Sequence, residues 1–102
     1  MSRRYVIEDD LHAERDSVHN TIQGAVQRLD ELARIPWDED PNLAPCQSWR
    51  TCGRQYEIIE YDTSIEPWTV LRRLPALEVS AQGVEWDRDL PRHRPDAGYD
   101  GA

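Results

Sequence analysis

The sequence predicts an α+β domain in which one long N-terminal helix packs on an antiparallel sheet of four to five strands. Two observations support this prediction. An apolar stripe with helical spacing runs from about residue 17 to residue 35, and β-prone runs follow between residues 55 and 86. A chain of 102 residues can bury one hydrophobic core. We therefore expect a single domain over residues 1–87 and a disordered polar tail over residues 88–102, where apolar residues are scarce.

The first half of the chain is expected to hold a short strand and the helix. Residues 5–7 are the β-prone run Tyr-Val-Ile, which an acidic triplet ends. Asp16 or Ser17 is the expected N-cap of the helix, because either side chain can accept a free N–H of the first turn. Pro36 ends the helix, since proline disfavours helical geometry at the preceding residue. The apolar residues three or four positions apart are Val18, Ile22, Val26, Leu29 and Leu32.

An irregular loop and a two-sided strand are expected next. Residues 36–48 contain three prolines and show no clear period. Residues 55–62 alternate, but Tyr56 and Ile58 fall on one face and Ile59 and Tyr61 on the other. One helix covers only one face of a sheet. The second apolar face therefore predicts another cover, most simply a second subunit.

Three further runs, at residues 68–71, 77–80 and 84–86, are predicted strands. The last two have apolar residues on one face only. Residues 81–83 between them are typical of a short hairpin loop with Gly83 at positive φ.

Composition excludes several kinds of chemistry. All 12 basic residues are arginines, so Schiff-base catalysis, pyridoxal phosphate anchoring and a lysine-containing phosphate loop are excluded. No cofactor is expected. A net charge of −8 argues against non-specific nucleic-acid binding and suits a basic protein partner, although solubility alone is the preferred explanation. No run of about 18 apolar residues is present, and the apolar pair at residues 6–7 is too short for a signal peptide. We expect a cytoplasmic protein.

Cys46 and Cys52 are the two cysteines of the chain. Arg50 and Arg54 nearby could favour a thiolate. The spacing matches no redox or zinc pattern, and buried cysteine often serves only as a small apolar residue. Packing is the preferred interpretation. A nucleophilic or redox role and a disulfide remain open alternatives.

An acid–histidine cluster lies near the N-terminus. Its members are Asp9, Asp10, His12, Glu14, Asp16 and His19. A helix beginning at Leu11 would place His12, Asp16 and His19 on one face at metal-ligand spacing. Because we place the helix start later, a solvated acidic turn is preferred and no metal site is predicted. No catalytic residue is predicted anywhere in the chain.

Trp37, Trp49, Arg50 and Arg54 could line a pocket for a carboxylate or phosphate. Cys46 and Cys52 lie within the same region. In the alternative, the two arginines pair internally with residues 38–40 or with Glu57.

The string PWDEDPNLAPCQSWRTCGRQYEIIEYD, preceded by DDLHAE and followed by GVEW, resembles a group of small uncharacterised bacterial proteins of the mobile-gene-cassette type. The resemblance covers roughly residues 4–87, and the Cys-Trp-Cys-Gly-Arg centre is its most specific part. It implies a compact α+β protein that forms homo-oligomers, and it transfers no activity.

The leading hypothesis is a binding module that self-associates through Ile59 and Tyr61 and holds a small anionic ligand or peptide near residues 36–54. The alternative is an acidic inhibitor or antitoxin-like protein that binds a basic partner through Asp38, Glu39 and Asp40. A thiol-dependent enzyme that uses Cys46 or Cys52 is the third hypothesis.

Overall fold

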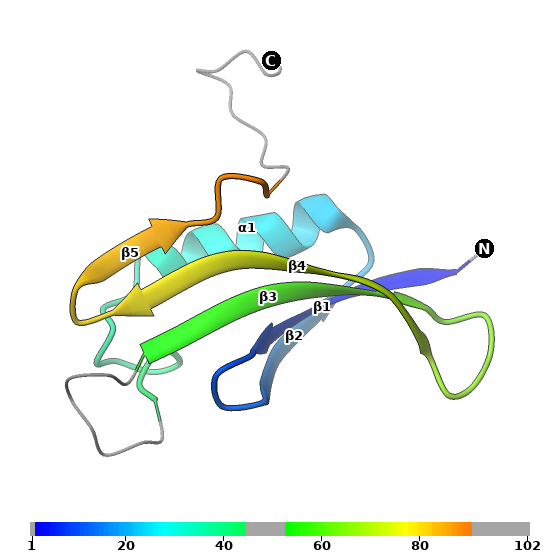
Figure 1. Cartoon of the computed structure of the whole chain (residues 1–102), viewed down its shortest axis with the longest axis horizontal. Coiled ribbons are helices and arrows are strands. Elements are labelled where there is room, and N and C mark those ends of the chain that lie inside the picture. The colour runs from blue at the N-terminus through cyan, green and yellow to red at the C-terminus, as the bar shows by residue number, and fades with distance from the viewer. Residues whose placement is uncertain (1, 45–52, 91–102) are drawn as a thin grey trace, which may run out of the picture.

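Five strands form one antiparallel sheet, and a helix lies across one of its faces (Figure 1). The structure is a computed structural model that describes residues 2–44 and 53–90. The elements in chain order are β1 (Arg3–Asp9), β2 (Glu14–His19), α1 (Ile22–Ala33), β3 (Gly53–Asp62), β4 (Thr69–Ser80) and β5 (Gly83–Trp86). Across the sheet the order is β2-β1-β3-β4-β5. The predicted α+β class, with four to five antiparallel strands, is confirmed.

The predicted long N-terminal helix is wrong in length and position. α1 has 12 residues and follows two strands. Its N-cap is Thr21, whose side-chain oxygen accepts a hydrogen bond of 3.0 Å from the Gly24 N–H, rather than Asp16 or Ser17. Residues 14–19 form β2 instead. Val18 has helical spacing to Ile22, but it belongs to that strand.

β4 is one continuous strand of 12 residues where the sequence predicts two. It pairs with β3 along its whole length, with register shifts between Tyr56 and Glu57 and between Glu60 and Tyr61 of β3. β5 pairs only with the end of β4, from Leu77 to Ser80. Pro75 therefore lies where the outer edge of β4 has no neighbouring strand, a position that tolerates proline. Gly83 begins β5 with φ 124°, which confirms the predicted hairpin loop.

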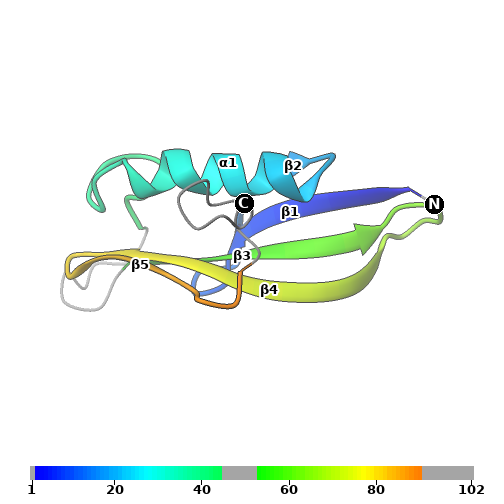
Figure 2. The ribbon, with the colours of Figure 1, turned by 90° about the horizontal axis from the view of Figure 1, so that it is seen from above.

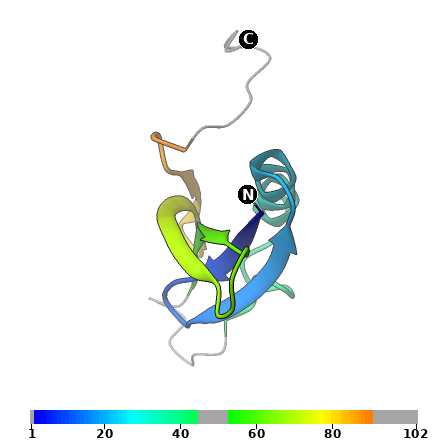
Figure 3. The same ribbon diagram turned by 90° about the vertical axis from the view of Figure 1, so that its right-hand side faces the viewer.

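The hydrophobic core lies between α1 and the face of the sheet that it covers (Figure 2). The end-on view of Figure 3 also places α1 on one side of the strands. The helix contributes Ala25, Val26, Leu29 and Leu32, and the sheet contributes Ile7, Tyr56, Ile58, Ala76, Leu77 and Val79. Leu90 also belongs to this core, and it lies beyond the predicted domain end at residue 87. Residues 91–102 of the predicted tail lie outside the described part.

The other face of the sheet carries the second apolar row that the sequence predicts. We call it the open face, because no described helix or strand covers it (Figure 2). By strand alternation it presents Val18 of β2, Arg4, Val6 and Glu8 of β1, Gln55, Glu57, Ile59 and Tyr61 of β3, Val70, Arg73 and Glu78 of β4, and Glu85 of β5. Val6 and Ile59 are fully buried although they lie outside the core next to α1. They are therefore already shielded within the single chain.

Asn42 fixes the loop after α1 to both the helix and the sheet. Its side-chain amide donates to the carbonyl oxygens of Leu32 and Ile35, at 2.9 and 2.8 Å, and accepts from the Tyr56 hydroxyl at 2.8 Å. The helix C-terminus leaves carbonyl groups without intrahelical partners. Asn42 satisfies two of the carbonyls at this end from a buried position.

Candidate functional site

The predicted anion-binding residues divide into two groups. Cys46, Trp49, Arg50 and Cys52 lie outside the described residues, so their roles stay predictions. Trp37 is half-buried and packs on the core. Arg54, at the start of β3, is 7% exposed.

Arg54 is held by carboxylates of the protein itself. Its guanidinium donates to Asp9 Oδ2 at 2.9 Å, to Glu14 Oε1 at 2.6 Å and to the carbonyl oxygen of Leu43 at 2.9 Å. Its Nε is buried and has no hydrogen-bond partner. The carboxylates that bind Arg54 are therefore neither those of residues 38–40 nor that of Glu57, the internal partners expected from the sequence. Glu57 pairs instead with Arg73 at 2.6 Å. A guanidinium that already binds two carboxylates is poorly suited to binding an anionic ligand.

Asp9 is the centre of the N-terminal acid–histidine cluster. It is 1% exposed, and it accepts hydrogen bonds from the Leu11 and Gln55 N–H groups and from His12 and Arg54. Burial alone would raise the pKa of Asp9, but the bonds from Arg54, Gln55, His12 and Leu11 hold the pKa below its ordinary value. The preferred solvated turn is thus wrong for Asp9, which is a buried structural anion. Among the residues described, no group of three suits a metal ion.

A small cavity of about 290 Å³ adjoins this network, lined by Asp9, Glu14, Arg15, Asp16, Asp40, Pro41, Arg54 and Tyr56. Asp40, the last residue of the 38–40 triplet, lies there beside the N-terminal turn. Its charges are largely neutralised from within, because Arg54 binds Asp9 and Glu14 while Arg28 binds Asp16 at 2.8 and 3.1 Å. These paired charges stabilise the fold, so we do not assign a ligand to this cavity.

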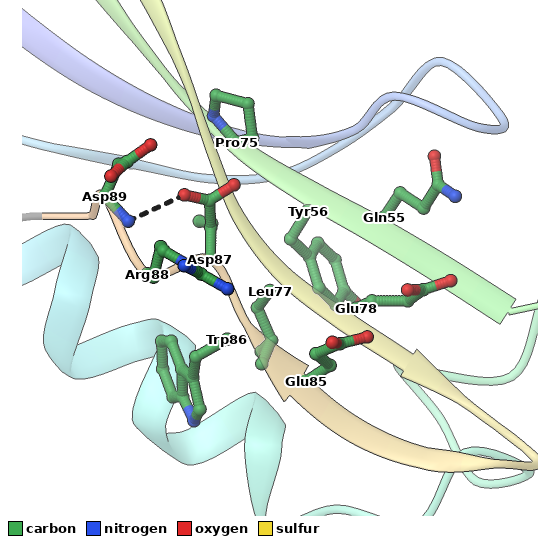
Figure 4. Close-up of a pocket in the computed structure, with 11 residues that line it drawn as sticks. Gln55, Tyr56, Pro75, Leu77, Glu78, Glu85, Trp86, Asp87, Arg88 and Asp89 are labelled. Carbon is green, nitrogen blue, oxygen red and sulfur yellow. Dashed lines mark hydrogen bonds between the residues drawn. The ribbon is translucent and has the colours of Figure 1, made fainter.

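A larger cavity of about 470 Å³ opens at the junction of β3, β4 and β5 (Figure 4). We call it the acidic cavity. It is lined by Gln55, Tyr56, Pro75, Ala76, Leu77, Glu78, Glu85, Trp86, Asp87, Arg88 and Asp89.

The acidic cavity opens beside the open face, where three of its polar residues present their side chains. Gln55 lies opposite Glu78, and Glu78 lies opposite Glu85, in the register of the three strands. Their chain neighbours Tyr56, Leu77 and Trp86 belong to or pack on the core beside α1. Because successive side chains of a strand point to opposite faces, Gln55, Glu78 and Glu85 point away from the helix, as Figure 4 shows.

The acidic cavity has an excess of negative charge. Four carboxylates line it, those of Glu78, Glu85, Asp87 and Asp89, against the single guanidinium of Arg88. Asp87 accepts a hydrogen bond of 2.9 Å from the Asp89 N–H. Glu78 and Glu85 are exposed and form no ion pair within the part of the chain that the structure describes. Like charges placed directly opposite on adjacent strands repel each other. A cationic group bound between them would relieve this repulsion.

The sequence contains a signal for this site that the predictions did not use. The runs Leu-Glu-Val at 77–79 and Val-Glu-Trp at 84–86 each place a glutamate on the solvent face, and the short loop at 81–83 makes them neighbours. The predicted partner-binding residues lie elsewhere. Asp38, Glu39 and Asp40 lie on the loop after α1, Tyr61 is half-buried, and Ile59 is buried on the open face.

None of the helices in the described residues is long and apolar enough to cross a membrane. The resemblance over residues 4–87 stays a prediction. No protein-family model, curated protein or solved structure matches this chain.

Proposed function

We propose that this protein is a small protein-interaction module that binds a basic segment of a partner in the acidic cavity. One observation carries the proposal: four carboxylates and one guanidinium line a cavity of about 470 Å³. Cavities that accept side chains are concave and present a few convergent polar groups. A guanidinium or an ammonium group carries a positive charge and N–H donors. The ionised carboxylates of Glu78 and Glu85 carry negative charge and can only accept hydrogen bonds, so the two kinds of group are complementary.

The charge of the whole chain supports the same class of partner. A net charge of −8 attracts basic proteins over a distance of several ångströms and speeds their association. The alternative hypothesis from the sequence also has a basic protein partner, but it places the contact at the 38–40 triplet rather than in the acidic cavity. The anionic ligand of the leading hypothesis is less well supported, because Arg54 is occupied by Asp9 and Glu14.

The proposal is tested by titrating an octa-arginine peptide into the ¹⁵N-labelled protein and following amide shifts by NMR. We expect the amides of Gln55, Glu78 and Glu85 to shift most. The double variant E78Q/E85Q should bind the peptide about 5- to 30-fold more weakly, since each exposed charge contact contributes about 0.5–1 kcal/mol.

The matched control is D38N/E39Q, which removes the same amount of charge from the loop after α1. It should weaken binding much less than E78Q/E85Q. Equal losses in both variants would show that the peptide responds to overall charge, and a larger loss in D38N/E39Q would assign binding to the 38–40 triplet. Either result would reject the acidic cavity as the binding site.

A further inference from the structure

The open face is electrostatically asymmetric along the strands. The half near the β3–β4 hairpin carries Arg4 and Arg73 and ends in apolar and aromatic side chains. The opposite half holds the acidic cavity with Glu78 and Glu85. Arg73 is engaged by Glu57. Arg4 donates only to the carbonyl oxygen of Arg3, at 2.9 Å, and binds no carboxylate of the described residues.

The hairpin half of the open face exposes apolar side chains on either side of its buried centre. Val18 and Val70 are each 44% exposed. Tyr61 is half-buried and its ring lies 5.7 Å from that of Trp68, at an interplanar angle of 59°. These side chains surround the buried pair Val6 and Ile59. Exposed apolar side chains beside charged ones are the usual composition of a protein–protein contact.

We propose that a second copy of this chain docks on the open face about a twofold axis that lies in the plane of the contact and crosses the strands at an incline, so that Arg4 of each copy lies in the acidic cavity of the other. This inference rests on the proposed function, because it names the cationic group that the cavity takes. In this orientation each acidic half meets a basic and apolar half. A contact with both copies in the same orientation would place the two acidic cavities against each other.

A face-to-face contact also fits the state of the sheet edges. The free edge of β4 carries Arg72, Arg73 and Pro75 and two irregularities of register. β2, the other edge, has a register shift and is short and charged. Charges, proline and bulges on an edge strand prevent the addition of further strands. A twofold contact between open faces is closed and stops at the dimer.

The test is the solution mass of the full chain by light scattering after gel filtration, over a range of concentrations. We expect the wild type to be a dimer, and the charge reversals R4E and E78R/E85R each to be monomeric or at least about tenfold weaker dimers. An equimolar mixture of the two variants should recover the dimer mass. In that heterodimer both cavities again pair opposite charges, because the new carboxylate of R4E faces the new guanidinium groups of E78R/E85R, while the native Arg4 faces the native Glu78 and Glu85. R34E, which reverses a charge at the end of α1, is the control and should remain dimeric.

Several outcomes would overturn the dimer. A monomeric wild type would do so. A dimeric R4E would also do so. The same holds for an equimolar mixture that stays monomeric, provided that both variants melt as cooperatively as the wild type. If a variant does not fold, the wild type decides alone: octa-arginine should compete with Arg4 and convert the dimer to monomer, and an unchanged mass at saturating peptide would reject the proposal. A monomer that binds the peptide only after removal of residues 91–102 would instead assign the cavity to Arg92 and Arg94 of the same chain.

The two proposals fail in distinguishable ways. A monomeric wild type whose peptide binding is weakened by E78Q/E85Q loses the dimer and keeps the cation site. A dimer that persists in both R4E and E78R/E85R, and whose peptide binding is unchanged by E78Q/E85Q, loses both.

Discussion

Asp9 joins the turn after β1 to the start of β3, which is far away in the sequence. Its carboxylate accepts from the start of β3 through Gln55 N–H, from the Arg54 side chain and from its own turn through Leu11 and His12. Arg54 extends the network to Glu14 and to the carbonyl of Leu43. A buried charge of this kind is costly unless each of its lone pairs is used, so the network is sensitive to the loss of any one partner.

Asp9→Asn should therefore lower the free energy of unfolding by about 2–3 kcal/mol, because it leaves the buried Arg54 with less compensating charge. Urea unfolding followed by circular dichroism measures this difference. The control is Asp10→Asn, one residue further on and exposed, which should change stability by no more than about 0.5 kcal/mol. Similar losses for both variants would contradict the assignment of Asp9 as the centre of the network.

The buried carboxylates also set the response to acid. Burial alone would raise the pKa of Asp16 and of Glu60, but arginine partners hold each pKa below its ordinary value: Arg28 for Asp16, and Arg72 and Arg3 for Glu60. Asp9 behaves in the same way. Such groups stabilise the fold fully above the unfolded pKa of about 4, and this stabilisation is lost as the pH falls through the lower folded pKa. Glu57 is the opposite case, because burial raises its pKa above the ordinary value in spite of Arg73.

We expect the urea midpoint to fall between about pH 5 and pH 2.5, with three carboxylates losing stabilisation and Glu57 opposing them. Glu60→Gln should flatten this decline and Glu57→Gln should steepen it, because protonation of Glu57 favours the fold. The two substitutions make the same chemical change on opposite faces of β3. Identical pH profiles for the two variants would show that their environments do not differ as described.

At the scale of the elements, Asn42 matters more than its place in an irregular loop suggests. It binds two carbonyls at the end of α1 and the hydroxyl of Tyr56 on β3. Burial raises the pKa of the Tyr56 hydroxyl above its ordinary value, so this donor stays protonated further into the alkaline range than an exposed tyrosine. The loop is thus part of the connection between helix and sheet.

Asn42→Ala should lower the free energy of unfolding by about 2–3 kcal/mol, since the carbonyls of Leu32 and Ile35 and the hydroxyl of Tyr56 each lose a buried or partly buried hydrogen bond. Hydrogen exchange should show the last turn of α1 exchanging faster than its first turn. Asn20→Ala, at an exposed position before the helix, is the control. If the last turn keeps its wild-type protection in Asn42→Ala, the loop does not hold the helix end.

The sequence predicts some of these elements well and misses others for physical reasons. The stripe Ile22, Val26, Leu29 and Leu32 correctly predicts α1 because a helix covering a sheet needs one apolar face. β2 is missed because it is an edge strand with one exposed valine and mostly polar residues, so it has no period-two signal. The middle of β4 is missed because its two arginines and its proline lie on an unpaired edge. The Arg54 network could not be predicted, because its partners are 40 and 45 positions away.

At the scale of the whole molecule, the two faces of the sheet differ in how they are covered. One face is closed by α1, and no helix or strand of the described residues covers the other. The two-sided character of β3 is visible in the sequence, and the strand register places Ile59 and Tyr61 on the open face. Ile59 is already buried within one chain. The apolar residues that a second copy would cover are therefore those around Ile59, such as Val18 and Val70.

Val18→Glu tests this last point directly. The substitution places a charge in the exposed apolar part of the open face, so it should raise the dissociation constant of the dimer by at least about tenfold. Because Val18 is 44% exposed on an edge strand, the stability of the monomer should change by less than about 1 kcal/mol. Leu43→Glu, at a residue 49% exposed on the loop after α1, is the matched control and should leave the dimer intact. Light scattering over a dilution series gives both dissociation constants. If the two variants dimerise equally well, the apolar part of the open face is not buried by the second copy, and the contact between copies must lie elsewhere.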